Sequence, residues 1–175
     1  MRRALAPLVV GALVLAAAGC GSSGTPHRTW VAGVCQALHP WRDRITTLNA
    51  QAAQQMQSAT NPVQTRDNLV RLLDGARQAS EDARVKVAGA GNPDVADGGA
   101  IEQRFVGALA AVRDAYGRAQ QTVQGLSTSD SAGFYQNVKA TMDTLNTDYK
   151  RAGLDVGKLA SADLQKDFGE VAECA

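Results

Sequence analysis

Long stretches of this chain repeat apolar or small residues at alternating steps of three and four. The clearest stretch carries them at Ile101, Phe105, Ala108, Val112, Ala115, Ala119, Val123 and Leu126. This spacing places the side chains on one face of an α-helix, where they can pack on a neighbouring helix. No stretch shows sustained period-two alternation rich in Val, Ile and Thr, which would indicate strands. The sequence therefore predicts an all-α fold.

The first helical stretch contains a proline. Its apolar face is formed by Trp30, Val34, Leu38, Trp41, Ile45, Leu48, Ala52 and Met56. Pro40 lies inside this pattern, where it has no backbone N–H to donate and clashes with the preceding turn. The segment is therefore either kinked at Pro40 or begins properly at Trp41, and we expect a short helix near 29–38 followed by a longer helix that ends at about residue 58.

Capping and turn-forming residues bound the remaining helices. Asn61, Pro62 and Gln64 form a start signal, which predicts a helix from 62 to about 88. Asp67 and Arg71 are expected to form an i,i+4 ion pair on its exposed face. A loop through Gly98 and Gly99 precedes the third helix, and the fourth carries apolar residues from Phe134 to Ala152. Ser161 caps a short last helix that buries Leu164, Phe168 and Val171.

These lengths and short connections predict an up-down four-helix bundle with a short fifth helix at the C-terminus. Alanine occupies many of the expected core positions, so the helices can approach closely and leave little room for a large internal cavity. A partly opened pair of helical hairpins is the alternative arrangement.

The first twenty residues have the layout of a secretory signal peptide. Arg2 and Arg3 give a positive start, and an apolar run from Leu5 to Ala18 follows. This run is shorter than the roughly 20 apolar residues of a typical spanning helix. An uncleaved membrane helix and an ordinary secreted protein with a spare thiol at Cys20 are the alternatives.

The end of this leader resembles the lipobox of bacterial lipoproteins. The matching residues are Ala17-Ala18-Gly19-Cys20, with Ala17 where the family most often has Leu. The resemblance implies that lipoprotein signal peptidase cleaves between Gly19 and Cys20, and that Cys20 carries a diacylglyceryl group. The predicted organisation is a signal peptide at 1–19, a flexible tether at 20–28 and a helical domain at 29–175. The lipid would anchor the protein on the extracytoplasmic side of the cell membrane.

The two other cysteines form an even pair once Cys20 is lipidated. Disulfides persist on the oxidising side of a membrane, so Cys35 and Cys174 are expected to be joined. Their separation excludes a CxxC redox pair, and no further ligands suggest a metal site. The bond would tie the first helix to the end of the chain.

The charge balance excludes one class of partner. The chain has net charge +1, and removal of a leader with two arginines and no acid turns this into −1. Nucleic acid is therefore not an expected partner. A nearly neutral domain also has little attraction for lipid headgroups, so the acyl chains must provide the attachment to the membrane.

No catalytic or cofactor-binding motif is evident. The chain lacks HExxH, GxSxG, P-loop and GxGxxG patterns. His27 is expected to be a solvated tether residue, and His39 a surface or helix-end residue. Asp94 and Asp97 lack the spacing of a calcium loop. No enzyme activity, metal or cofactor is therefore expected.

Two groups of residues are considered as candidates for recognition. Trp30 and Trp41 are expected to pack in the core, with a membrane contact or a binding hot spot as alternatives. Four glutamines of the first helical stretch are expected to form an exposed patch: Gln51, Gln54, Gln55 and Gln57. This patch is either plain solvated surface or a surface that binds a partner. We expect a non-catalytic module that binds another envelope component. A carrier or sensor with an apolar groove beside Trp30, Trp41 and Phe105, and a purely structural or stress-related envelope protein, are the alternatives.

Overall fold

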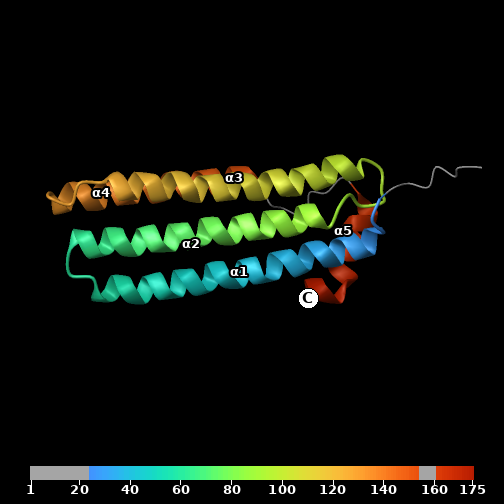
Figure 1. The fold of residues 1–175 in the computed structure, drawn as a ribbon, viewed down its shortest axis with the longest axis horizontal. Coiled ribbons are helices and arrows are strands. Elements are labelled where there is room, and N and C mark those ends of the chain that lie inside the picture. The colour runs from blue at the N-terminus through green and yellow to red at the C-terminus, as the bar shows by residue number, and fades with distance from the viewer. Residues whose placement is uncertain (1–23, 154–160) are drawn as a thin grey trace, which may run out of the picture.

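The computed structural model describes residues 24–153 and 161–175, and these are almost entirely helical (Figure 1). The elements follow in the order α1 (His27–Ser58), α2 (Pro62–Gly89), α3 (Gly98–Gly125), α4 (Ser131–Ala152), α5 (Ala162–Glu170) and η2 (Ala172–Cys174). The predicted all-α class is confirmed. The chain forms a four-helix bundle with a short C-terminal helix.

The helices run up and down along one long axis (Figure 1). The loops 59–61 and 126–130 lie together at one end, which we call the hairpin end. Loop 90–97, α5 and the C-terminus lie at the other end, which we call the disulfide end. The long helices pack in sequence order, α1 on α2, α2 on α3 and α3 on α4. Among the described residues, α1 also packs on α5 and η2, but its backbone does not come close to that of α4.

The helix α1 is continuous, so the predicted interruption at Pro40 is wrong. Pro40 is exposed, and its missing N–H costs the helix one internal hydrogen bond. Leu38 and Trp41, on either side of it, are 4% and 7% exposed. Burial of both flanking side chains in one core holds this turn helical against the local preference of proline, which shows tertiary packing overriding sequence propensity.

Small residues let α2 and α3 pack closely. The buried alanines between them and their neighbours are Ala76, Ala79, Ala83, Ala115 and Ala119. Close approach also marks the contact between α1 and α2, because a Cβ atom on Gly75 would lie 2.9 Å from Leu48 Cδ2. The expected role of small residues in the core is confirmed.

The predicted caps are largely confirmed. The Asn61 side chain accepts a hydrogen bond from Gln64 N, and the Ser161 hydroxyl accepts one from Leu164 N. The helix α3 starts at Gly98 rather than after the glycine pair, because Asp97 adopts a left-handed conformation at φ 59° and turns the chain into the helix. Gly98 is required there, since a Cβ atom would lie 2.0 Å from the carbonyl oxygen of Pro93.

The folded domain begins before the predicted boundary at residue 29. The helix α1 starts at His27, and Thr25 is already part of the structure. Thr25 N donates to Asn92 O at 2.7 Å, and its hydroxyl donates to Ala90 O at 2.9 Å. The last residues of the predicted tether are therefore built into the disulfide end.

The core is divided unequally between the two ends. At the disulfide end, Trp30, Phe105 and Phe168 form a ring cluster with centroids 5.4–6.3 Å apart. At the hairpin end a smaller cluster is formed by Leu69, Leu73, Ala119 and Val123, and Phe134 at the start of α4 is buried as well. Half-buried residues surround this smaller core: Met56, Val70, Leu72, Tyr116, Val138, Met142 and Leu145.

Candidate binding surface

The predicted cysteine bridge is present in the structure. Cys35 on α1 and Cys174 in η2 are joined, with their Cα atoms 5.1 Å apart. Glu170 and Val171 precede this bridge at the end of α5, so the bond fixes the C-terminus to the start of the bundle. The predicted leader and lipidation residues, from Ala17 to Cys20, lie outside the described residues.

The prediction for His27 is wrong. It is the first residue of α1, and its Nδ1 atom is in hydrogen-bonding contact with Asp167 Oδ2 on α5. Asp167 is 3% exposed, and Arg28 Nη1 lies 3.5 Å from its other carboxylate oxygen. This cluster clamps α5 onto the N-terminus of α1, where a buried carboxylate is favoured by the helix dipole. His39 lies half-buried inside α1 rather than at a helix end.

The tryptophans are core residues, as predicted. Trp30 is fully buried and its Nε1 donates to Gly91 O at 2.7 Å, while Trp41 Nε1 donates to Ser80 Oγ at 3.1 Å. A groove of about 270 Å³ borders Trp41, but its walls include Arg44 and Lys86. This groove has charged walls, so it is not the apolar groove that the carrier hypothesis requires beside the tryptophans.

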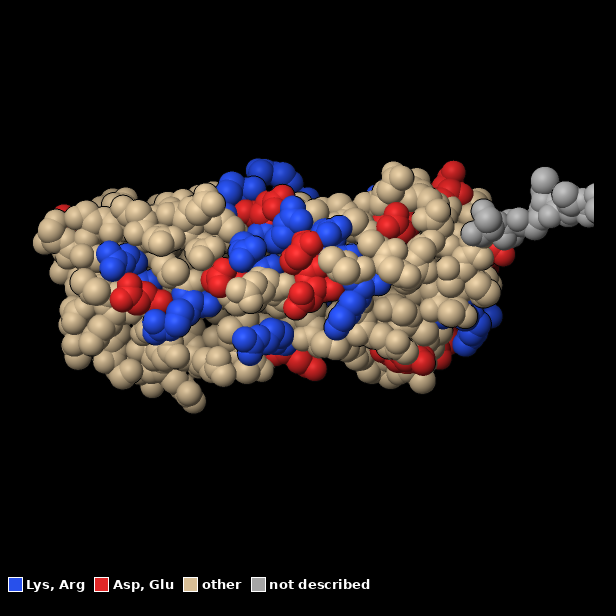
Figure 2. Space-filling view, viewed as in Figure 1, with Lys and Arg blue, Asp and Glu red and all other residues tan. Residues whose placement is uncertain are grey.

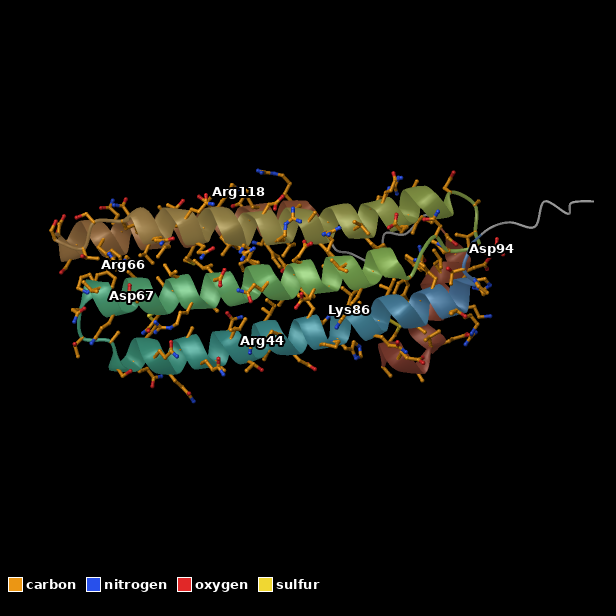
Figure 3. All side chains as sticks on the ribbon, in the orientation of Figure 1. Arg44, Arg66, Asp67, Lys86, Asp94 and Arg118 are labelled. Atoms are coloured by element: carbon orange, nitrogen blue, oxygen red, sulfur yellow. A yellow bond between two sulfur atoms is a disulfide. The ribbon has the colours of Figure 1, made fainter. Side chains whose placement is uncertain are left out.

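Charge is distributed unevenly along the bundle (Figure 2). No charged residue stands between Arg44 and Arg66, and between Arg118 and Lys139 the only one is Asp130. Arg44 lies about midway along α1, and Arg118 lies about two turns before the end of α3 (Figure 3). Asp130 is occupied as the cap of α4, because its carboxylate accepts hydrogen bonds from Ala132 N and Gly133 N. The last half of α1 and the end of α3 are thus free of charge.

We call residues 45–65 and 119–138 the uncharged end, because Asp130 is their one charged residue. The mutually paired Arg66 and Asp67 lie beside it at the start of α2 (Figure 3). Amide side chains dominate its exposed surface: Asn49, Gln51, Gln54, Gln55, Gln57, Asn61, Gln64, Gln121, Gln124, Gln136 and Asn137. Val63 and Tyr135 are its exposed large apolar residues, at 44% and 47% exposure. Each amide can both donate and accept hydrogen bonds. The surface therefore suits partners that form many neutral hydrogen bonds.

The middle of the bundle contrasts with this end because its charges pair across helices. Glu81 on α2 accepts hydrogen bonds from Arg84 at 2.6 and 2.8 Å and from Arg113 on α3 at 2.8 Å. The hydrogen bonds from Arg84 and then Arg113 lower the pKa of Glu81 to about 2. Bonds to Asp114 and Glu81 raise the pKa of Arg113. These groups stabilise the α2–α3 contact and are not available to a ligand.

A surface groove of about 390 Å³ lies between α3 and α4 and runs into the uncharged end. Buried or half-buried side chains form its floor: Ala115, Ala119, Leu126, Thr141 and Leu145. The exposed Ala140 lines its edge. Thr122, Asn137 and Thr144 stand at its edges. Its volume falls within the range of about 300–1,000 Å³ that is usual for ligand sites.

An ion pair closes the inner end of this groove. Arg118 Nη2 on α3 donates to Asp148 Oδ2 on α4 at 2.7 Å, and Arg151 Nη1 donates to the other oxygen at 3.1 Å. The hydrogen bond from Arg118 lowers the pKa of Asp148. The carboxylate thus stays charged and satisfied, and the groove beyond it is neutral.

Part of this surface is evident in the sequence. The four glutamines of α1 are predicted to be exposed, and all four are. The groove is not evident, because it depends on which face of α4 lies beside α3. The sequence signal that could have identified the rest of this surface is the absence of charged residues over 45–65 and 119–129.

Comparison with known proteins does not assign this chain to a family. No protein-family model, curated protein or solved structure matches this chain. Within residues 24–153 and 161–175, no helix is long and apolar enough to cross a bilayer. The same residues contain no cluster of three or more His, Cys, Asp or Glu side chains arranged to hold a metal ion.

Proposed function

We propose that this protein is a lipid-anchored, extracytoplasmic binding module of the cell envelope, without catalytic activity. The observation that carries the proposal is the uncharged end, which lies opposite the end where the chain enters the bundle. The leader that resembles a lipobox supports anchoring at Cys20, which precedes in sequence the first described residue, Gly24, at the disulfide end. The bundle would then present its uncharged end to an envelope component away from the membrane.

The placement of the titratable residues favours binding over catalysis. His27 serves as a clamp on Asp167, and Glu81 and Asp148 are held by arginines. Side chains committed in this way stabilise packing between helices. A purely structural envelope protein would need no such charge-poor surface, which is why we prefer the binding module to that alternative.

The anchor is tested by the mass of the full chain produced in a bacterial host. We expect the wild-type protein to start at Cys20 with a diacylglyceryl adduct, and Cys20→Ala to lack the adduct. Cys35→Ala is the matched control, because it removes a different thiol and should keep the lipid. An unlipidated wild-type protein would refute membrane anchoring through Cys20.

The binding role is tested by photo-crosslinking in intact cells. A photo-reactive residue placed at the exposed positions Gln54 or Gln124 should give reproducible adducts. The same residue at Lys86, which is exposed but lies toward the disulfide end (Figure 3), should give none. Equal labelling from all three positions, or labelling from none, would support the structural alternative instead.

A further inference from the structure

We infer that the groove between α3 and α4 binds a neutral, hydroxyl-rich polysaccharide, an inference that rests on the proposed binding function and names the class of its ligand. Two observations lead to it. The groove combines an apolar floor with polar edges, and it opens into a surface that carries amides and hydroxyls in place of charges.

The cross-section of the groove matches the two kinds of surface on a pyranose ring. Such a ring has an apolar face of C–H groups and a rim of hydroxyl groups. Ala119 on the floor and Ala140 at the edge are small enough for the ring face to come close. Ala140 is exposed, so this edge of the groove is accessible without rearrangement of the core.

The edges provide hydrogen bonds to the hydroxyl groups. The Asn137 amide is exposed and forms no hydrogen bond with the described residues, so both its donors and its acceptor are free. The hydroxyls of Thr122 and Thr144 donate to Arg118 O and Ala140 O at 3.0 Å, and each keeps lone pairs that can accept. The groove thus offers a mixed set of neutral donors and acceptors.

Charge argues against the other classes of macromolecule. Nucleic acids and anionic lipid surfaces require clusters of Lys and Arg, and the one cation that lines the groove, Arg118, is paired with Asp148. A stable protein interface needs a mostly apolar centre within about 1,200–2,000 Å² of buried surface. At the uncharged end only Val63 and Tyr135 are large, apolar and exposed. A neutral polymer of hydroxyl groups fits what remains.

The test measures binding of the purified full-length protein, in mild detergent, to polysaccharides. The panel contains neutral glucan, mannan, galactan, arabinan and chitin, and a sulfated form of the glucan. We expect at least one neutral polysaccharide to bind, and the sulfated glucan to bind no better than the neutral glucan. Binding should change less than about twofold from 0.1 to 1 M salt, although the Debye length falls from about 10 to about 3 Å.

Substitutions place the ligand in the groove. Ala140→Ile adds a rigid side chain to the lining of the groove and should weaken binding about tenfold, equivalent to about 1.4 kcal/mol. Ala53→Ile is its control, because Ala53 is an exposed alanine of the uncharged end on α1. Asn137→Ala removes one hydrogen-bonding group and should weaken binding about fivefold. Asn49→Ala removes an exposed amide outside the groove and should change nothing.

Several results would overturn the inference. These are no binding to any neutral polysaccharide, stronger binding to the sulfated glucan, steep loss of binding with salt, or equal affinity of Ala140→Ile and wild type when circular dichroism shows both folded. The proposed function is tested separately by crosslinking. Adducts to an envelope protein from positions 54 and 124, without polysaccharide binding, would leave the binding module standing and remove only the ligand class.

Discussion

The disulfide end and the hairpin end of this bundle hold their helices together by different means. The disulfide end has the ring cluster of Trp30, Phe105 and Phe168, the buried Asp167 and a covalent bond. The hairpin end has a small core with half-buried residues around it. Aromatic side chains bury large areas and dominate core energetics. The ring cluster and the disulfide therefore concentrate stabilising contacts at the end where the chain enters, while Phe134 is the one fully buried ring among the described residues of the hairpin end.

The difference also separates two roles within one fold. The strongly packed end positions the helices, and the lightly packed end leaves polar side chains and a groove accessible. Ligand-binding segments are commonly drawn from the less stable parts of a structure. The comparison predicts that substitutions at the two ends differ in cost.

The largest effect is expected at the ring cluster. Trp30→Ala should lower the free energy of unfolding by about 3–5 kcal/mol, because it removes a fully buried indole. Met142→Ala, at the half-buried margin of the hairpin end, should cost about 1 kcal/mol. Urea unfolding followed by circular dichroism measures both. Equal costs would show that stability is distributed evenly.

Removal of the disulfide should have the next largest effect. Replacing Cys35 and Cys174 together by Ala should lower the free energy of unfolding by about 2–4 kcal/mol, because the unfolded chain is no longer constrained. Amide hydrogen exchange should increase most in α5 and η2. Reduction of the wild-type protein is the control and should reproduce the pattern. A larger increase at the hairpin end would contradict the comparison.

The smallest effect concerns the charged middle, which separates the two ends. The pKa of Glu81 is lowered from 4.5 to about 2, so its charge stabilises the fold above pH 4.5 and this contribution is lost as pH falls toward 2. The carboxylate side chain is 35% exposed, and solvent screening reduces the contribution to about 1 kcal/mol.

Glu81→Gln should therefore be less stable than wild type at pH 7 and equally stable at about pH 2, as measured by thermal unfolding across pH. Asp82→Asn is the control: Asp82 is exposed and has no ion pair among the described residues. Its substitution should change stability by less than about 0.5 kcal/mol. A stability difference for Glu81→Gln that persists at low pH would exclude an origin in the charge of Glu81.

The fold was predictable where local signals and packing agree. Asn61, Pro62 and Ser161 mark helix starts through their own backbone chemistry, and the structure places them at those positions. The pattern of α3 predicted its buried face, including Ile101 and Val123. The paired cysteines were predictable from their number and the expected compartment.

The rest depends on contacts between distant residues. Pro40 remains within a helix because Leu38 and Trp41 are buried on either side, and no local rule reports that burial. His27 looked like a tether residue because its partner, Asp167, lies 140 positions away. The expected pair of Asp67 and Arg71 does not form. Asp67 pairs with Arg66, and Arg71 donates to Asn68.

The position of the disulfide also determines what a protease can do to this domain. Cys35 lies in the first helix and Cys174 is the penultimate residue, so the loops 59–61, 90–97 and 126–130 all lie within one covalent ring. A single cut in any of these loops opens the ring without releasing a fragment. The disulfide closes the domain into one covalent loop, so a chain cut once within this loop separates into two pieces only after reduction.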